Sequence, residues 1–103
     1  MDYIDKIEIK ITNLNNKIEL FIIPSTLKVY VKDKAKSIDK EQIDRLLRII
    51  CRWDYEYINN SIIDAQTFKI RVYSKNGVDE YFGCGKYPKN YHEFIELVRG
   101  IYE

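Results

Sequence analysis

The feature that most constrains this chain is the alternation of apolar and polar side chains in its first third. Isoleucine, leucine or valine occupies every second position in three successive runs, which are separated by an asparagine-rich turn and by Pro24. A period of two is typical of a β-strand with one buried face. The sequence therefore predicts a three-stranded antiparallel meander at residues 7–12, 18–22 and 27–32.

A helix is predicted after the meander because two start signals coincide. Asp39 and Gln42 have the spacing of a capping box, and Ile38 can pack against Ile43 as a hydrophobic staple. Apolar residues then recur every three or four positions, as on one face of an α-helix. This pattern predicts one amphipathic helix over residues 39–58.

The polar stripe of this helix carries three arginines among acidic residues. Because acids lie three or four positions from the arginines, ion pairs along a solvated helix face are the simplest interpretation. A row of arginines that binds phosphate is the alternative. The stripe consists of Glu41, Asp44, Arg45, Arg48, Arg52 and Glu56.

A second hairpin is predicted around Asn76-Gly77, a two-residue signal for a tight turn. With this pair at the tip, Arg71 faces Phe82 across the hairpin. One face of the hairpin is then apolar and is expected to join the core, whereas the other is polar and aromatic. The apolar face consists of Phe68, Ile70, Val72, Tyr81, Gly83 and Gly85, and the other face of Lys69, Arg71, Tyr73, Glu80, Phe82 and Cys84.

Two glycines end the last predicted strand, in the stretch GCGKYPKNYHEF at residues 83–94. Gly83 and Gly85 fall on the apolar face, opposite Ile70 and Phe68. Glycine in a strand commonly marks a close approach of other atoms to the backbone. We therefore expect these glycines to leave room for a covering helix.

A final helix is predicted over residues 89–102. Pro88 suits a helix entry, and Asn90 with Glu93 repeats the capping-box spacing. One-sided strands and one-sided helices must share a buried layer. The sequence thus predicts an α+β fold in the order βββαββα, with a five-stranded antiparallel sheet and two helices packed on one face.

The glycine-rich stretch lacks the features of a reactive site. Tyr87-Pro88 intervenes before the helix, and no Lys-Ser/Thr pair follows the glycines as in phosphate loops. Cys84 is expected on the sheet face away from the helices, whereas His92 is expected in a helix. One histidine and two separated cysteines supply too few metal ligands. We therefore predict no catalytic, cofactor-binding or metal-binding residues, and a protein that is not an enzyme.

The length and net charge of the chain limit the classes of protein to which it can belong. The chain has 103 residues and a net charge of +1, which predicts one domain over residues 1–103 without a global attraction to nucleic acid or membranes. Cys51 and Cys84 have no metal-like or redox spacing, and no leader or membrane-length apolar run is visible. These features predict a cytoplasmic protein with reduced thiols, and the composition rich in Ile, Lys, Asn and Tyr indicates an AT-rich bacterial or phage genome.

The segment from Phe68 to Ile101 carries a resemblance to known proteins. It contains an alternating strand, a KNG turn, an aromatic strand ending in glycines, and then YPKNYHEFIELV. This order resembles the carboxy-terminal hairpin and helix of many small bacterial proteins, including immunity proteins, small enzyme inhibitors and proteins of unknown function. Emfourin-like protease inhibitors have a comparable order of hairpin, helix, hairpin and helix. The resemblance implies a small binding protein.

The sheet face away from the helices supplies the functional hypothesis. Aromatic side chains and arginine, which anchor protein interfaces, fall on this face. We expect it to bind another protein, a toxin or an enzyme, or a second copy of the chain as a homodimer. Single-stranded nucleic acid stacked on the same aromatics is the alternative, and an ordinary solvated face is the third interpretation, because Tyr and Phe favour strands in any case. The predicted partner-binding residues are Phe21, Lys28, Tyr30, Lys69, Arg71, Tyr73, Glu80 and Phe82.

Overall fold

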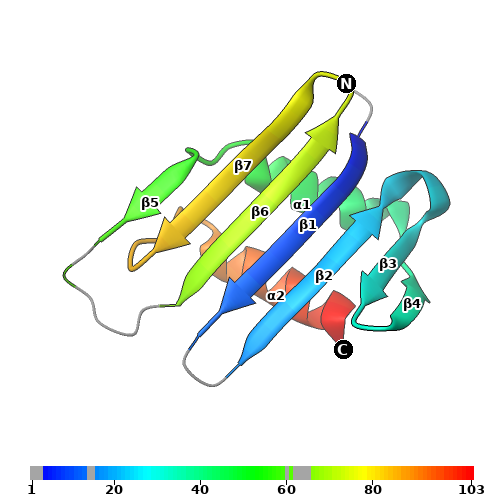
Figure 1. The fold of residues 1–103 in the computed structure, drawn as a ribbon, viewed down its shortest axis with the longest axis horizontal. Helices are drawn as coiled ribbons and strands as arrows, with labels where there is room; N and C mark the ends of the chain where they lie inside the picture. Colours follow the sequence, from blue (N-terminus) through cyan, green and yellow to red (C-terminus); the bar gives the residue numbers. More distant parts are fainter. Residues whose placement is uncertain (1–3, 14–15, 60, 62–65) are drawn as a thin grey trace.

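The computed structural model describes residues 4–13, 16–59, 61 and 66–103. These residues form one layer of seven strands with two helices packed on one of its faces (Figure 1). The strands are β1 (Ile4–Thr12), β2 (Lys17–Ile23), β3 (Lys28–Val31), β4 (Lys34–Ser37), β5 (Glu56–Ile58), β6 (Thr67–Ser74) and β7 (Gly77–Cys84). The helices are α1 (Lys40–Ile50) and α2 (Tyr91–Tyr102), and a short 3-10 turn, Pro24–Thr26, joins β2 to β3.

Strand β1 lies at the centre of the sheet, whose order is β4-β3-β2-β1-β6-β7-β5. It pairs with β2 on one side and with β6 on the other, antiparallel in both cases. The pairing of β5 with β7 is parallel, so the sheet is mixed. The expected α+β class with two helices is therefore confirmed, but the five-stranded antiparallel sheet in the order βββαββα is wrong. Within the described residues the order is ββββαβββα.

The predicted helix 39–58 is too long. Its start is confirmed, because the Asp39 N–H donates to Gln42 Oε1 at 3.0 Å in the expected capping box. Helix α1 ends at Ile50, after which the N–H of Trp53 bonds back to the Ile50 carbonyl and closes a tight turn. The next residues extend along β7 as the short strand β5.

The other missed strand, β4, has no alternating pattern that would predict it. It is four residues long and pairs with β3, with Ala35 opposite Tyr30. The turn before it places Lys32 at φ 55°, in the left-handed region. Both sheet edges are thus short strands, and β4 carries Lys34 and Lys36, a common defence of exposed edges.

The second hairpin is offset by two residues from the predicted register. Ser74 pairs with Gly77, so that Lys75-Asn76 forms the tip and Arg71 faces Glu80 rather than Phe82. Gly77 adopts φ 125°, a conformation that favours glycine. Because the offset is an even number, every side chain keeps its predicted face.

The two glycines act differently from the expectation. Gly83 lies opposite Phe68, and a Cβ atom at Gly83 would overlap the Phe68 ring. Gly85 has φ 78°, and a Cβ there would lie 2.5 Å from the Asn59 carbonyl oxygen. The glycines therefore make room for a ring of the same sheet and for the chain after β5, rather than for a covering helix.

Helix α2 begins at Tyr91 without the predicted capping box. Asn90 has φ 68°, and its side chain makes no capping hydrogen bond. The first-turn contacts are made by the main chain instead, from Tyr91 to the Pro88 carbonyl and from Phe94 to the Asn90 carbonyl. The start of this helix therefore lacks a side-chain cap.

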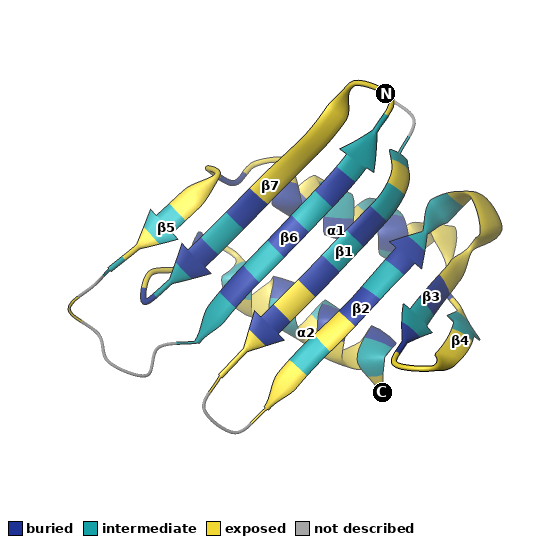
Figure 2. Ribbon diagram, in the orientation of Figure 1, coloured by how far each residue is buried: buried dark blue, intermediate teal, exposed yellow. Residues whose placement is uncertain are grey.

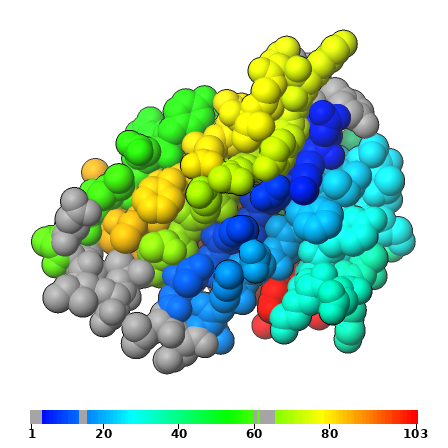
Figure 3. Space-filling model, viewed as in Figure 1, coloured from blue at the N-terminus to red at the C-terminus, as the bar shows by residue number. Residues whose placement is uncertain are grey.

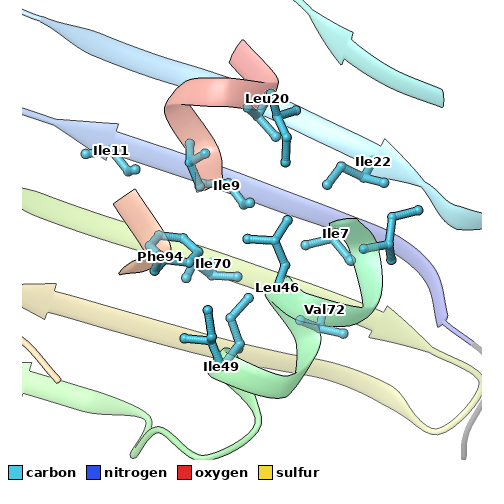
Figure 4. Packing of buried hydrophobic residues seen from close by; sticks show 14 of the residues in the cluster. Ile7, Ile9, Ile11, Leu20, Ile22, Leu46, Ile49, Ile70, Val72 and Phe94 are labelled. Atoms are coloured by element: carbon cyan, nitrogen blue, oxygen red, sulfur yellow. The ribbon is translucent and has the colours of Figure 1, made fainter. Parts of the chain in front are cut away.

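The core lies between the sheet and the two helices (Figures 2 and 4). Alternate residues of the central strands point into it, and Ile7, Ile9 and Ile70 are fully buried there. Leu46 of α1 and Phe94 of α2 pack on them from the helix side, also fully buried. The faces predicted for strands and helices are thus confirmed. Neither helix of the described residues has the length and apolar character needed to span a membrane.

Candidate functional site

All eight predicted site residues lie on the sheet face away from the helices, here called the open face. The alternation that buries Ile7, Ile9 and Ile70 turns their neighbours outward, so the face follows from strand parity. Figure 3 shows this face with the side chains of the central strands in front. The eight residues are Phe21, Lys28, Tyr30, Lys69, Arg71, Tyr73, Glu80 and Phe82.

A continuous row of side chains crosses five strands of the open face. The pairing registers place Tyr30 beside Phe21, Phe21 beside Glu8, Glu8 beside Arg71 and Arg71 beside Glu80. The rings of Phe21 and Tyr30 stack with their centroids 4.8 Å apart. At the other end of the row, Arg71 Nε lies 2.7 Å from Glu80 Oε2. The row therefore combines an aromatic pair with a charged pair.

Lys6 joins the aromatic and charged parts of this row. Its Nζ lies 4.7 Å from the centroid of the Phe21 ring and 5.6 Å from that of Tyr73. The same ammonium lies 3.2 Å from Glu8 Oε1, and the Tyr73 hydroxyl donates to that oxygen at 2.8 Å. Lys6, Glu8, Phe21 and Tyr73 thus form one cluster, which we call the Lys6 cluster.

Sequence reasoning missed Lys6 as a site residue. The expected strand began at Ile7, whereas β1 begins at Ile4, with a register irregularity between Ile4 and Lys6. Lys6 has the same parity as Glu8 and Lys10, which is the signal that could have placed it on the open face. Its contact with Tyr73 depends on the pairing of β1 with β6, for which the sequence has no local signal.

Two carboxylates of the open face, those of Glu8 and Glu80, are held in their charged forms. Burial alone would raise the pKa of Glu8, but the hydrogen bonds from Tyr73 and Lys6 outweigh it and the pKa lies below its ordinary value. The hydrogen bond from Arg71 lowers the pKa of Glu80, and the same bond raises the pKa of Arg71. At neutral pH both carboxylates are therefore ionised, and their hydrogen bonds hold the side chains of Arg71 and Tyr73.

Three predicted residues, Lys28, Lys69 and Phe82, lie outside both the Lys6 cluster and the row of side chains across the five strands. Lys69 lies between Lys10 and Phe82 in the next row of the sheet. Lys28 lies near the β4 edge, where its Nζ is 3.5 Å from the Ser37 hydroxyl. The open face is thus one surface with an ordered centre, and Phe82 and the two lysines border it.

The relief of the open face is shallow. A hollow of about 360 Å³ lies over β1, β2 and the end of β3, beside the stacked rings. All four predicted aromatics are half-buried by their neighbours rather than fully exposed. The hollow is lined by Lys6, Glu8, Lys10, Glu19, Leu20, Phe21, Tyr30 and Lys32.

Basic side chains outnumber acidic ones on the described open face. Among the described residues outside this face, basic and acidic side chains are equal in number, so the basic excess belongs to the open face. Such an uneven distribution favours a partner surface with acidic groups. The basic residues are Lys6, Lys10, Lys17, Lys28, Lys32, Lys69 and Arg71, and the acidic residues are Glu8, Glu19, Glu56 and Glu80.

The two cysteines and the histidine lie on different elements, Cys51 at the end of α1, Cys84 on β7 and His92 on α2. Cys84 lies at the end of β7 on the open face, opposite Thr67, whereas exposed His92 lies on α2 and contacts Glu96 at 3.0 Å. Both cysteines are free thiols. Among the described residues, no three His, Cys, Asp or Glu side chains come together as a metal-binding group.

Comparison of the chain with protein-family models, curated proteins and solved structures found no match. The class of the fold is α+β, with a mixed sheet whose open face carries aromatic and charged side chains. The function proposed below therefore depends on the geometry of that face.

Proposed function

We propose that this chain is a small non-enzymatic binding module, of the immunity or inhibitor type, whose open face binds another protein. The observation that carries the proposal is the centre of that face, where the Lys6 cluster and the row from Tyr30 to Glu80 hold one another in place. Phe21, Tyr30, Tyr73 and Arg71 are residue types that anchor protein interfaces. They lie on β2, β3 and β6, and Lys6 and Glu8 of the intervening strand β1 bridge them.

The contacts among these residues support binding because they fix the side chains in advance. Immobilising a flexible side chain on binding costs about 0.5–1.5 kcal/mol. Arg71 is already held by Glu80, and Tyr73 by Glu8, in the free protein. A partner that docks on these groups therefore loses less of its binding free energy to ordering them.

The charge of the open face defines the partner that we propose. The excess of basic groups suits an acidic protein surface, and the acids Glu8 and Glu80 set its orientation. We propose a bacterial toxin or an enzyme as this partner, in the cytoplasm. A second copy of the chain is an alternative occupant of the same face.

Single-stranded nucleic acid is the second candidate function, favoured by the same basic excess and by the stacked pair Phe21–Tyr30. Nucleic-acid binding differs from protein binding in its salt dependence. The logarithm of the binding constant for a nucleic acid falls steeply and linearly with the logarithm of the salt concentration, because counterions are released from the phosphates. Affinity for an oligonucleotide measured across a salt series therefore separates the two functions.

The experiment uses the double substitution Tyr73→Ala, Phe82→Ala. The tagged protein is isolated with its bound protein from its own cells, the partner is produced separately, and the affinity of the purified pair is measured by calorimetry. We expect the double variant to bind at least about thirtyfold more weakly, which is about 2 kcal/mol. Light scattering of the protein alone reports whether the partner is a second copy.

A matched pair of arginine variants controls for loss of charge. Arg71→Ala removes a basic group from the open face, and Arg99→Ala removes one from α2, on the other side of the sheet. Binding should weaken only in the first. A folded double variant that retains full affinity, or equal effects of the two arginine variants, would overturn the proposal.

A further inference from the structure

The three arginines of the predicted helix stripe border one hollow, which the proposed function does not use. Arg45 and Arg48 lie on α1, and Arg52 lies in the turn that follows it. A hollow of about 240 Å³ separates this part of the chain from the start of α2. It is lined by Arg45, Arg48, Ile49, Arg52, Asn90 and Glu93.

The positive charge of this hollow is only partly balanced. Arg45 Nη2 lies 3.9 Å from Glu93 Oε1, a long ion pair between two side chains that are each about half exposed. Arg48 Nε donates to the main-chain carbonyl of Asp44 at 3.4 Å. Among the described residues, no carboxylate lies within ion-pair distance of Arg48 or Arg52. The expected lacing of arginines with acids along the helix is therefore not what the geometry shows.

The start of α2 adds to the positive potential of the same hollow. The first N–H groups of a helix have no partner within it, and they carry a partial positive charge. Asn90 does not cap them with its side chain, because its main chain is in the left-handed region. Asn90 and Glu93, at this start of α2, line the hollow beside the arginines.

The hollow is small, and three of its six lining residues are arginines. Pockets for drug-sized molecules occupy about 300–1,000 Å³, and this hollow is smaller than that range. Guanidinium groups bind the oxygens of phosphate in a bidentate manner. We propose that the arginine hollow binds a terminal phosphate group, either as inorganic phosphate or as the phosphate of a small monoester.

The proposal assigns a specific role to Glu93. Its carboxylate lies on the hollow and neutralises part of Arg45, so it competes with a phosphate for that guanidinium. Glu93→Gln removes the competing charge and keeps the side-chain shape. Phosphate should therefore bind more tightly to this variant, which a merely structural role of the hollow does not predict.

The test is a titration of the isotope-labelled protein with inorganic phosphate, followed by NMR at constant ionic strength. We expect saturable shifts at the His92 and Glu93 amides and at the Arg48 and Arg52 Nε groups. Arg48→Gln and Arg52→Gln should each weaken binding about tenfold, and Glu93→Gln should strengthen it severalfold. Arg99→Gln, which removes the same charge elsewhere on α2, should leave the dissociation constant unchanged.

Two further arms distinguish the sources of the phosphate. Glycerol phosphate presents a monoester, and tighter binding of it than of inorganic phosphate identifies the monoester as the ligand. An oligonucleotide with internal diesters presents only a polyanion. Circular dichroism shows whether each variant is folded. Whether the hollow saturates with phosphate is judged from the titration of the wild-type protein, which does not depend on any variant.

Three results would overturn the inference. The first is the absence of saturation with phosphate and with glycerol phosphate up to about 10 mM in the wild-type protein. The second is equal weakening by Arg99→Gln, which would indicate non-specific attraction. The third is that the oligonucleotide binds whereas phosphate and glycerol phosphate do not, which would make the hollow part of a surface that binds polyanions.

Discussion

Replacing Gly83 by alanine tests the packing at the end of the hairpin. Its Cβ would overlap three atoms of the Phe68 ring, and that ring is only 1% exposed. The ring cannot move aside easily, because Trp53 and Tyr91 lie against it with centroids at 5.6 and 5.2 Å. The main chain of Gly83 is also held, since it pairs with β6 on one side and β5 on the other.

The expected cost follows from this rigidity. Overpacking in a core typically costs about 1–3 kcal/mol. Because neither Phe68 nor the main chain of Gly83 can move easily, we expect Gly83→Ala to lower the free energy of unfolding by about 3 kcal/mol. For a chain of this size, each 1 kcal/mol lowers the melting temperature by about 4–8 °C. Urea unfolding monitored by Trp53 fluorescence gives the free energy directly, with an unchanged slope if the unfolded state is unaffected.

A double-mutant cycle separates this cause from a general intolerance of side chains at Gly83. Phe68→Leu replaces the ring that the new methyl group would meet with a smaller, flexible side chain. The double variant Phe68→Leu, Gly83→Ala should therefore be more stable than the sum of the two single effects implies, by about 0.5–3 kcal/mol. Additive effects, or an alanine variant as stable as the wild type, would show that Phe68 is not the reason for glycine here.

Further predictions concern the core and two titrating groups. Ile50→Ala should lower the free energy of unfolding by about 2–5 kcal/mol, because Ile50 is 1% exposed, whereas Cys51→Ala next to it should change little. Tyr73→Phe should raise the pKa of Glu8 from its lowered value towards the ordinary 4.5, as measured by NMR of the carboxyl carbon. Because the pKa of Glu8 is lowered on folding, its stabilisation is present above pH 4.5 and is lost as the pH falls through the folded pKa; the variant should show less of this acid loss in urea unfolding. Burial, and then the charge of Asp79, raises the pKa of Tyr81 from 10.0 to about 12. Between pH 10 and 12 the folded state therefore keeps a proton that the unfolded state loses, so the free energy of unfolding should fall over this range. Tyr81→Phe should make that fall smaller.

The long strands were predictable because their side chains alternate over many residues. One buried face repeats at every second position in β1, β2 and β6, and no helix could bury that pattern. The edge strands β4 and β5 were not predictable in this way. Trp53 and Tyr57 are four residues apart, a spacing that fits a helix, yet with Tyr55 between them they also fit a strand. A run this short fits both the helical period of about 3.6 residues and the strand period of two, so it predicts neither element.

The members of the open face were predictable, but their contacts were not. The odd or even position of a residue along its strand was enough to place Arg71 and Tyr73 outside the core. This assignment holds although the predicted hairpin register was wrong by two residues, because an even offset leaves each side chain on the same face. The partners of these residues are Glu80, Glu8 and Lys6, and two of those three lie on β1. Which residue of β1 meets which residue of β6 is set by the assembled sheet, and no turn between them fixes it.

The central place of β1 has a consequence for synthesis of the protein. On the ribosome, β1 and β2 can form a hairpin early, but the other edge of β1 has no partner until β6 is made, after α1 and β5. Throughout that interval the nascent chain presents an open strand edge and an isoleucine face, both prone to aggregation. The pairing of β6 with β1 closes that edge and, in the same step, brings Tyr73 to Glu8 and Lys6. The end of the vulnerable period and the completion of the Lys6 cluster are therefore one event.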